Sequence, residues 1–463
     1  MSVAGKPAVG RVAALLLLPL VLLAGCTTPR AYLGEATERV VPEAGYRGTA
    51  VLADRTEDDL LVLVSLSGGG MRASAMAYGL FEQLAADQLE HAGRRLRVLD
   101  EVDVLSAVSG GAVTATYYAL YGDRLFADFA ARFLDRDVTA ALRRRVFLDP
   151  RNWLRLASSD FSRGDLYAEY FDRRLFRGST FADLERTGGR PFLVINATDI
   201  GLASRFEFTQ DDFDLICMDL ARYPLSRAVA ASSSVPVIST PITLRNHAGQ
   251  CGYRLPTWVE ETLRIDDHSS RRYFRAAAMK ARTDTQRFAY LHLVDGALSD
   301  NLGARALLDA LNDADDRMGL QRLPTAGENP RIVYISLNAG DSQVPRIGMS
   351  RGPPDMFEML RLMGTVPVDR YTAESRVLLR EALQEHARRR GATLHYIEIE
   401  LESLRADAAL ADLVELPTSF DLPRAQAGAL RCATRRLLAA AEDYRGLLAA
   451  YGSAPVAPAR CER

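Results

Sequence analysis

Two apolar runs in this chain each end in a group of small residues, and each is followed by a helical pattern. The first run, Leu60–Leu66, leads into Ser67-Gly68-Gly69-Gly70, and the second, residues 102–108, leads into Ser109-Gly110-Gly111. Similar short apolar runs lie at residues 191–197, 291–294 and 331–337. Because buried strands that alternate with helices belong to parallel sheets covered on both faces, the pattern predicts an α/β layer architecture with a mostly parallel central sheet.

The C-terminal part, residues 306–463, continues the alternation of helical and strand-like patterns and is expected to extend the same core. The expected helices are residues 71–90, 112–120, 369–390 (ended by Gly391) and 423–451, and residues 397–401 are expected to form a strand with one wet face.

The N-terminus has the features of a targeting segment. Lys6 and Arg11 precede an apolar run at residues 12–25, which is too short to span a bilayer. The run ends in Leu23-Ala24-Gly25-Cys26, which resembles the bacterial lipobox. The resemblance implies a signal peptide over residues 1–25, acylation of Cys26 and export, with residues 26–58 as a tether and lead-in. Thr27 after the cysteine favours display on the outer membrane facing the periplasm, and the alternatives are an ordinary secretory signal or a transmembrane anchor.

The remaining cysteines and the charge limit the possible cofactors and partners. Cys217, Cys251, Cys432 and Cys461 permit two disulfides in an oxidising compartment, with sequence neighbours paired, although buried free thiols would explain them equally well. No Cys/His spacing indicates a metal site. The formal net charge of −2 gives no reason to expect nucleic acid as a partner.

Ser109 lies where a strand-like run meets a helical one. A serine nucleophile must project from a tight strand-to-helix turn, which requires small neighbours, and Ala107, Gly110 and Gly111 are small. A capping serine at a glycine-rich helix start would give the same pattern.

The glycine run at Gly68, Gly69 and Gly70 exposes backbone N–H groups at the start of a helix. Such a loop binds negative charge, either a phosphate or the oxyanion of an acyl-transfer reaction. A dinucleotide-binding loop is disfavoured because no acidic residue ends a second strand about 20 residues later. We therefore expect an oxyanion hole from these glycines with Gly110, and Arg72 is a candidate contact for an anionic head group or a structural ion-pair residue.

Asp295 follows the apolar run at residues 291–294 and precedes Gly296, which places its carboxylate at the end of a strand. Such a carboxylate can act as the base for a serine hydroxyl, whereas an Asp-Gly turn is the simpler explanation of the pair. His292 lies three residues earlier, so strand alternation directs it to the opposite face. A Ser/Asp dyad is expected, and a triad that uses His292 is the alternative.

The glycine loop, the serine turn and Asp295-Gly296-Ala297 occur in the order of the patatin-like phospholipase family, which the chain resembles over residues 60–305. Asn196-Ala197-Thr198-Asp199 and the run at residues 230–236 look like further family segments. The resemblance implies a three-layer α/β/α fold and a metal-independent Ser/Asp hydrolase of lipid esters that needs no cofactor. Two positions depart from the family pattern, since Ala107 replaces the first glycine of its G-x-S-x-G motif and Ser67 replaces a frequent aspartate.

Residues 143–177 contain nine arginines and five acidic residues interleaved with aromatic side chains. The segment is expected to form solvated helices with buried aromatic residues, and the alternative is a surface that meets anionic lipid. Together these features predict a lipid-anchored acyl hydrolase of the bacterial envelope. The second hypothesis is an envelope lipoprotein that uses the same fold as a non-catalytic binding module.

Overall fold

The protein is described here by a computed structural model. It describes residues 32–53, 59–91, 93–158, 160–188, 190–236, 239–312, 316–324, 329–340 and 351–461, except for the side chains of His91, Phe357, Leu360 and Arg361. None of the helices in these ranges combines the length and the apolar composition needed to cross a bilayer.

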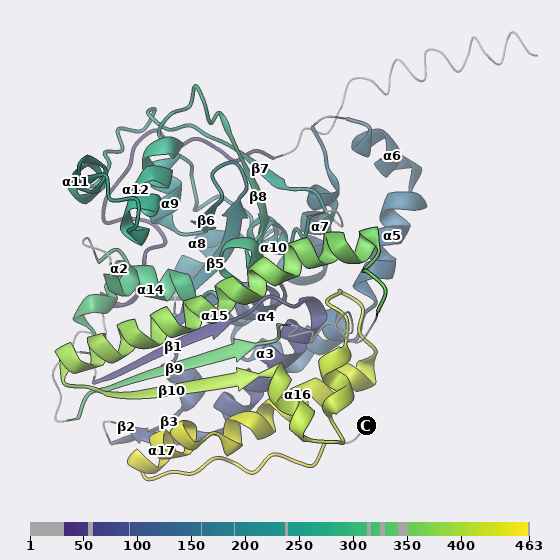
Figure 1. Cartoon of the computed structure of the whole chain (residues 1–463), viewed down its shortest axis with the longest axis vertical. Coiled ribbons are helices and arrows are strands. Elements are labelled where there is room, and N and C mark those ends of the chain that lie inside the picture. The colour runs from purple at the N-terminus through teal and green to yellow at the C-terminus, as the bar shows by residue number, and fades with distance from the viewer. Residues whose placement is uncertain are drawn as a thin grey trace, which may run out of the picture.

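A central sheet of eight strands forms the middle layer of the molecule (Figure 1). Its order is β10-β9-β1-β4-β5-β8-β7, with β6 paired to β5. The first five strands in this order are parallel, and β8 runs antiparallel to both β5 and β7. This confirms the α/β class and the mostly parallel sheet. The strands are β1 (Leu60–Leu66), β4 (Val104–Val108), β5 (Phe192–Asp199), β6 (Ser204–Glu207), β7 (Ile242–Arg245), β8 (Tyr290–Asp295), β9 (Arg331–Asn338) and β10 (Thr393–Glu400), and a separate hairpin pairs β2 (Gln88–His91) with β3 (Arg94–Arg97).

The chain leaves the neighbouring strands β1 and β9 in opposite directions. From β1 it passes through α3 (Gly70–Ala86) to β4, and from β9 through α15 (Met356–Arg390) to β10. Because such crossovers are right-handed, the two helices lie on opposite faces of the sheet, and α15 crosses the front of the sheet in Figure 1. A reversal of this kind opens a crevice at the carboxyl ends of the strands, where ligands of α/β proteins bind.

The remaining helices complete the two outer layers, and one hydrophobic core runs from the N-terminal segment to the last helix. They are α2 (Gly48–Val51), α4 (Ser109–Tyr121), α5 (Val138–Phe147), α6 (Pro150–Leu156), α7 (Arg163–Phe171), α8 (Phe181–Arg186), α9 (Gln210–Leu215), α10 (Leu225–Ser232), α11 (Thr257–Ile265), α12 (Arg271–Arg282), α13 (Ala297–Asp300), α14 (Ala304–Asn312), α16 (Arg424–Ala440) and α17 (Glu442–Ala450), with π-helical segments at Leu125–Leu134 and Asp172–Phe176.

The four expected helices have different ends in the structure. Helix α4 begins at Ser109, three residues before the expected start, and ends at Tyr121. Helix α3 stops at Ala86 because the next residue, Asp87, is extended and its carboxylate accepts the N–H of Val456 (2.7 Å) and the hydroxyl of Tyr444 (2.8 Å). Helix α15 begins at Met356, well before the expected residue 369. The carboxylate of Asp355 caps this start by accepting the N–H of Glu358. The expected final helix is two helices, since the backbone is extended at Ala441.

Part of the expected tether is docked onto the domain. Tyr46 is fully buried, and its hydroxyl accepts the N–H of Leu193 on β5 at 2.7 Å. The guanidinium of Arg47 forms ion pairs with Asp211 (2.6 Å) and Asp214. A buried aromatic ring and a buried ion pair fix this segment, so the assignment of the whole of residues 26–58 to a tether is wrong. Cys26 and the signal peptide lie outside the described residues.

Both expected disulfides are present. Cys217 is bonded to Cys251, and Cys432 on α16 is bonded to Cys461 in the C-terminal tail. The pairing of sequence neighbours is therefore confirmed.

Candidate active site

Ser109 is the first residue of α4, directly after β4. Its φ of +50° is in the left-handed region, which a residue with a Cβ adopts only where the surroundings impose it. Strain of this kind at a strand-to-helix turn is the geometry that lifts a serine nucleophile out of the sheet.

Asp295, the last residue of β8, lies against this serine. The hydroxyl Oγ of Ser109 donates a hydrogen bond to Oδ2 of Asp295 at 2.8 Å, and the N–H of Ala297 donates to Oδ1 at 2.9 Å. The antiparallel pairing of β8 with β5 sets Asp295 opposite Ala197, and the hydroxyl of Thr198 donates to the Asp295 carbonyl at 2.9 Å. The structure thus brings together the two residues that the sequence singled out.

The Asp295 carboxyl is almost wholly buried, and this burial raises its pKa to about 6 even though the N–H of Ala297 and the hydroxyl of Ser109 both act to lower it. A carboxylate with this pKa is largely ionised at neutral pH, yet it is a stronger base than an exposed aspartate. It is suited to accepting a proton from a serine that attacks a carbonyl.

A second serine, which the sequence analysis did not assign, fixes the backbone of the turn. Oγ of Ser232, at the end of α10, accepts the N–H of Ser109 at 2.8 Å and donates to the carbonyl of Asn196 at 2.6 Å. Two residues on, the carbonyl of Ser234 accepts the N–H of Asp295 at 2.9 Å. In the sequence, Ser232-Ser233-Ser234 resembles a segment of the family, but no local signal indicates that it bridges both candidate catalytic residues.

The glycine loop passes close to the start of α4. Gly69 and Gly70 have φ values of +140° and +60°, and a Cβ on Gly110 would lie 1.9 Å from the Gly70 carbonyl oxygen. The N–H groups of Gly69, Gly70 and Gly110 have no protein acceptor among the described residues. That of Gly68 donates to the carbonyl of Asn301 at 2.9 Å. The prediction that Gly68 donates to the oxyanion is therefore wrong, because its backbone N–H is already bonded to the Asn301 carbonyl.

The loop is anchored from the C-terminal half of the chain. The hydroxyl of Ser67 accepts the N–H of Ala339, which follows β9, at 2.8 Å and donates to the Gly68 carbonyl at 2.8 Å. The N–H of Met71 donates to the carbonyl of Ser419 at 2.7 Å. The serine that departs from the family pattern thus ties the loop to the neighbouring strand.

Arg72 has a structural position. Its side chain is buried, and its guanidinium donates to the Leu416 carbonyl and to the hydroxyl of Thr418 at 2.7 Å. The prediction that Arg72 contacts an anionic head group is therefore wrong for this arrangement. The buried guanidinium instead holds the segment at residues 416–418, next to Ser419, which packs on the glycine loop.

The described histidine side chains do not contact Ser109 or Asp295. His292 is exposed on the opposite side of β8, with Nδ1 3.0 Å from the hydroxyl of Thr243. His386 and His395 contact the carbonyls of Leu323 and Asp443. A cluster of His, Cys, Asp or Glu side chains able to hold a metal ion is absent from the described ranges.

Comparison with models of known protein families assigns the chain to a family. The family model described as patatin-like phospholipase matches residues 64–308, more than half of the chain. The chain therefore belongs to the patatin-like phospholipase family, a class of lipid hydrolases. A search of curated proteins gives no match to the sequence.

Two solved structures of human GIVD cytosolic phospholipase A2 are similar to this protein, one of them in complex with methyl gamma-linolenyl fluorophosphonate inhibitor and terbium chloride. Both share 14% sequence identity with this chain, with TM-scores of 0.35 and 0.34. The matches cover 76% and 79% of this chain and 66% and 54% of theirs, so the chain matches less than two thirds of the length of either.

Proposed function

We propose that this protein is a serine acyl-ester hydrolase that uses Ser109 as nucleophile and Asp295 as base on lipid esters. The observation that carries the proposal is the 2.8 Å hydrogen bond from Ser109 Oγ to a buried carboxylate, made by a serine whose backbone is strained. A helix cap accounts for neither the strain nor the carboxylate.

In the first half-reaction Ser109 Oγ forms a bond to the acyl carbon while its proton passes to Oδ2 of Asp295. The N–H groups of Gly69 and Gly70, with that of Gly110, stabilise the negative oxygen. The alcohol then leaves with the proton held by Asp295. Water attacks the acyl-enzyme in the same way, returns a proton to Ser109 through Asp295 and releases the fatty acid.

Fluorophosphonate labelling of the purified protein tests the nucleophile. Labelling is expected in the wild type and absent in Ser109→Ala. Asp295→Asn should lose ester turnover while keeping its circular dichroism spectrum. Ser233→Ala is the matched control, because the Ser233 hydroxyl is buried one residue from Ser232 and has no hydrogen-bond partner in the described structure. Labelling that survives Ser109→Ala would refute the proposal.

The same experiment decides between the alternatives. A non-catalytic binding module predicts no labelling and no Ser109-dependent hydrolysis. A triad predicts that His292→Ala is as damaging as Asp295→Asn, whereas the dyad predicts near wild-type activity, since His292 is exposed and contacts Thr243.

We further propose that the enzyme works at the bacterial envelope, anchored by a lipid on Cys26. The support is the lipobox pattern at residues 23–26 and the two disulfides, which fit an exported protein. Incorporation of labelled palmitate in cells that express the protein should be lost in Cys26→Ser. Equal incorporation in the variant would exclude this anchor.

An exposed apolar patch at the junction of α5 and α6 supports contact with a lipid surface. We call Phe147, Leu148, Trp153 and Leu154 the α5–α6 patch; their exposed fractions lie between 54% and 76%. Arg143, Arg144 and Arg151 are exposed on the same two helices. Large apolar side chains beside arginines are typical of segments that insert into the surface of an anionic bilayer.

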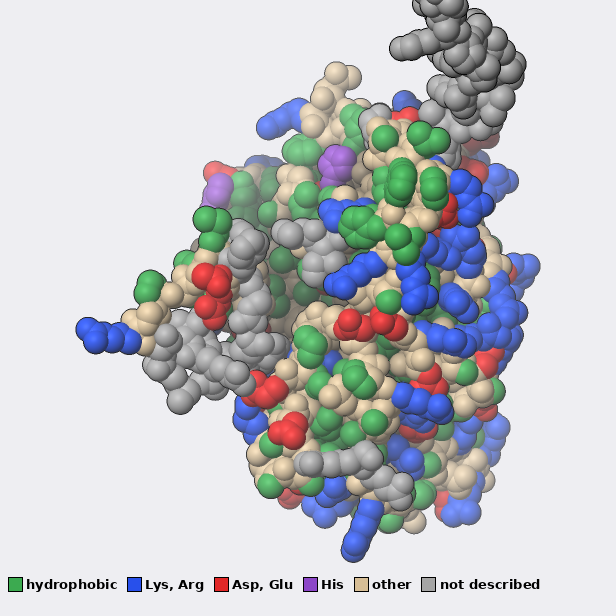
Figure 2. Space-filling view, turned by 90° about the vertical axis from the view of Figure 1, so that its right-hand side faces the viewer, with side chains coloured by type: hydrophobic (Ala, Val, Ile, Leu, Met, Phe, Trp, Pro, Cys, Tyr) green, Lys and Arg blue, Asp and Glu red, His purple; other side chains and the backbone are tan. Residues whose placement is uncertain are grey.

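Helices α5 and α6, which carry the patch, lie on the side toward which β1, β9 and β10 point (Figure 1). Ser109 follows the carboxyl end of the parallel strand β4 and so belongs to the same side of the sheet. Figure 2 views this side, with apolar side chains near the top and a broad field of arginines beside them. The aromatic side chains of the following segment differ, since Phe161, Tyr170, Phe171 and Phe176 are buried as expected. Within residues 143–177, only the α5–α6 patch fits the alternative of a lipid-facing surface.

A further inference from the structure

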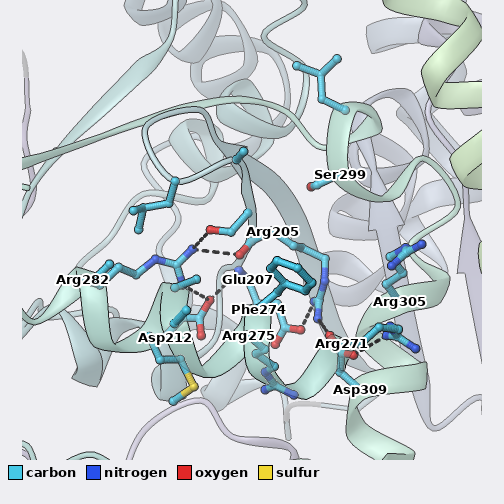
Figure 3. A pocket seen from close by; sticks show the side chains of 18 of the residues that line it. Arg205, Glu207, Asp212, Arg271, Phe274, Arg275, Arg282, Ser299, Arg305 and Asp309 are labelled. Atoms are coloured by element: carbon cyan, nitrogen blue, oxygen red, sulfur yellow. Dashed lines mark hydrogen bonds and ion pairs between the residues drawn. The ribbon is translucent and has the colours of Figure 1, made fainter. Parts of the chain in front are cut away.

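A cavity of about 780 Å³ is lined by residues of β6 and of α12, α13, α14 and α15 (Figure 3). Its volume is typical of a site for a small molecule. Six arginines and three acidic residues line it, so its wall carries an excess of positive charge. These residues are Arg205, Arg271, Arg275, Arg282, Arg305, Arg317, Glu207, Asp212 and Asp309.

The acidic residues of the cavity wall pair with arginines of the same wall. Asp309 is shared, because Oδ2 lies 2.5 Å from Arg205 and Oδ1 lies 2.7 Å from Arg271. Glu207 pairs with Arg205, and Asp212 lies 3.9 Å from Arg282. These pairs use the available carboxylates and leave Arg305 without one.

Arg305, on α14, is held in place by neutral groups. Its Nε donates to the hydroxyl of Ser375 at 2.8 Å, and its guanidinium carbon lies 3.5 Å from the centre of the Tyr371 ring. The residue is only 9% exposed. Its side-chain hydrogen bond to a described residue uses Nε, which leaves the terminal nitrogens for the cavity that Arg305 lines. The nearby carboxylate of Asp300 accepts the backbone N–H groups of Ala304 and Arg305 instead.

Two like charges therefore face the same space. Figure 3 places Arg271 and Arg305 on the same side of the cavity. Burial and the positive charge of Arg271 lower the pKa of Arg305, against the raising effects of Tyr371, Asp300 and Asp309. Arg305 is buried and Arg271 is partly exposed, and Asp309 is paired with Arg271, so an anion bound between the two guanidinium groups would relieve the repulsion that remains.

We infer that this cavity binds the phosphate group of an anionic ligand, with the terminal nitrogens of Arg305 and Arg271 as donors. Arginine forks match the oxygens of phosphate. The phosphate belongs either to a lipid head group or to a free phosphate ester. Phe274 and Leu298, which are exposed at the lining, provide apolar contacts for an attached chain.

The site is distinct from the Ser109/Asp295 pair but connected to it. Ser299, in the cavity wall, lies 2.8 Å by its hydroxyl from that of Thr198, which in turn donates to the Asp295 carbonyl. Binding at the cavity is measured without hydrolysis, so its test is independent of the proposed reaction.

Isothermal titration of the full chain with inorganic phosphate, at constant ionic strength in chloride, tests the site. The wild type should bind phosphate, and Arg305→Gln should raise the dissociation constant about tenfold or more, because a charge-assisted bidentate contact is lost. Arg376→Gln is the matched control: it removes the same charge from α15 beside Ser375, but Arg376 pairs with Glu398 and Glu400. Absent binding, or equal weakening by Arg376→Gln, would overturn the inference.

Arg271→Gln provides a second variant if Arg305→Gln does not fold, since Arg271 is half-exposed, and it should also weaken phosphate binding. Titrations with octyl phosphate, which has no acyl ester, and with neutral octyl glucoside distinguish a lipid head group from a free phosphate ester as the source of the phosphate. Tighter binding of octyl phosphate than of inorganic phosphate indicates a lipid head group, and equal binding indicates a free phosphate ester. Octyl glucoside that binds as tightly as octyl phosphate would exclude a phosphate site.

Discussion

Asp295 holds its charge inside the protein, with only two hydrogen bonds to compensate for the lost water. Its pKa of about 6 sets the pH at which the proposed base is ionised. We expect kcat/KM to be level above that pH and to fall about tenfold per pH unit below it, because the protonated carboxyl cannot accept the proton of Ser109. A pH–rate profile with a soluble ester checks this. A kcat/KM that stays level down to pH 4 would show that a group other than Asp295 is the base.

The side chain missing at Gly110 is as important as the side chain present at Ser109. A Cβ at Gly110 would lie 1.9 Å from the Gly70 carbonyl oxygen, so Gly110→Ala must push the helix start away from the glycine loop. Overpacking of this kind costs about 1–3 kcal/mol in the free energy of unfolding and should abolish turnover. Both are measured by urea unfolding and an ester assay.

Gly428, on α16, is the control for that substitution. A Cβ there meets no atom within 4 Å, so Gly428→Ala should leave activity unchanged and stabilise the helix by up to about 1 kcal/mol. Equal loss of activity in the two variants would contradict the proposed close approach.

Ser109 and Asp295, which the structure joins by a hydrogen bond, could be singled out from the sequence because each follows an apolar strand in its own small-residue motif. Arg72 could not be placed, since its partners Leu416 and Thr418 lie more than 340 residues away in the chain. The bond from Ser109 to Ser232 was missed for the same reason: the sequence does not reveal which hydroxyl lies within hydrogen-bonding distance of a given N–H.

At the scale of elements, α5 and α6 expose the patch that we assign to lipid contact. Replacing Trp153 and Leu154 by serine should weaken flotation with anionic vesicles about tenfold or more, because both apolar side chains are lost from the interface. Hydrolysis of a soluble ester should not change. Ile265→Ser on α11 removes an equally exposed apolar side chain and should leave flotation unchanged. Loss of soluble-ester activity would mean that the patch supports the fold instead.

Six of the eight strands of the central sheet were predictable, because five are apolar runs of ordinary length and β10 alternates, whereas the short strands β6 and β7 were not predicted. The ends of helices were less predictable. The stop of α3 depends on contacts of Asp87 with Tyr444 and Val456, and nothing local at Ala441 marks the break between α16 and α17. The cavity could not be predicted at all, because its arginines come from elements far apart in the chain.

At the scale of the whole molecule, the tail is fastened to α16 by the Cys432–Cys461 disulfide, which closes a loop of 29 residues. Removing a crosslink over such a loop costs about 3–4 kcal/mol in the chain-entropy model. The variant Cys432→Ser/Cys461→Ser should therefore unfold at a clearly lower temperature than the wild type, and added reductant should narrow the difference. Identical melting temperatures without reductant would show that the bond contributes nothing to stability.

The family model ends at residue 308, yet the sheet does not. Strands β9 and β10 continue it beyond β1, as the sequence pattern led us to expect, although the boundary at residue 305 stays a prediction. What the sequence could not show is that this later part completes the glycine loop.

Ser419 packs on Gly70 and accepts the N–H of Met71, so the loop proposed to hold the oxyanion takes its shape from the far end of the chain. A chain synthesised from its N-terminus presents Ser109 and Asp295 well before residue 419 is added. The proposed hydrolase would thus stay inactive until the last segment of its chain docks on the glycine loop, and would not act on lipids while it is still being made.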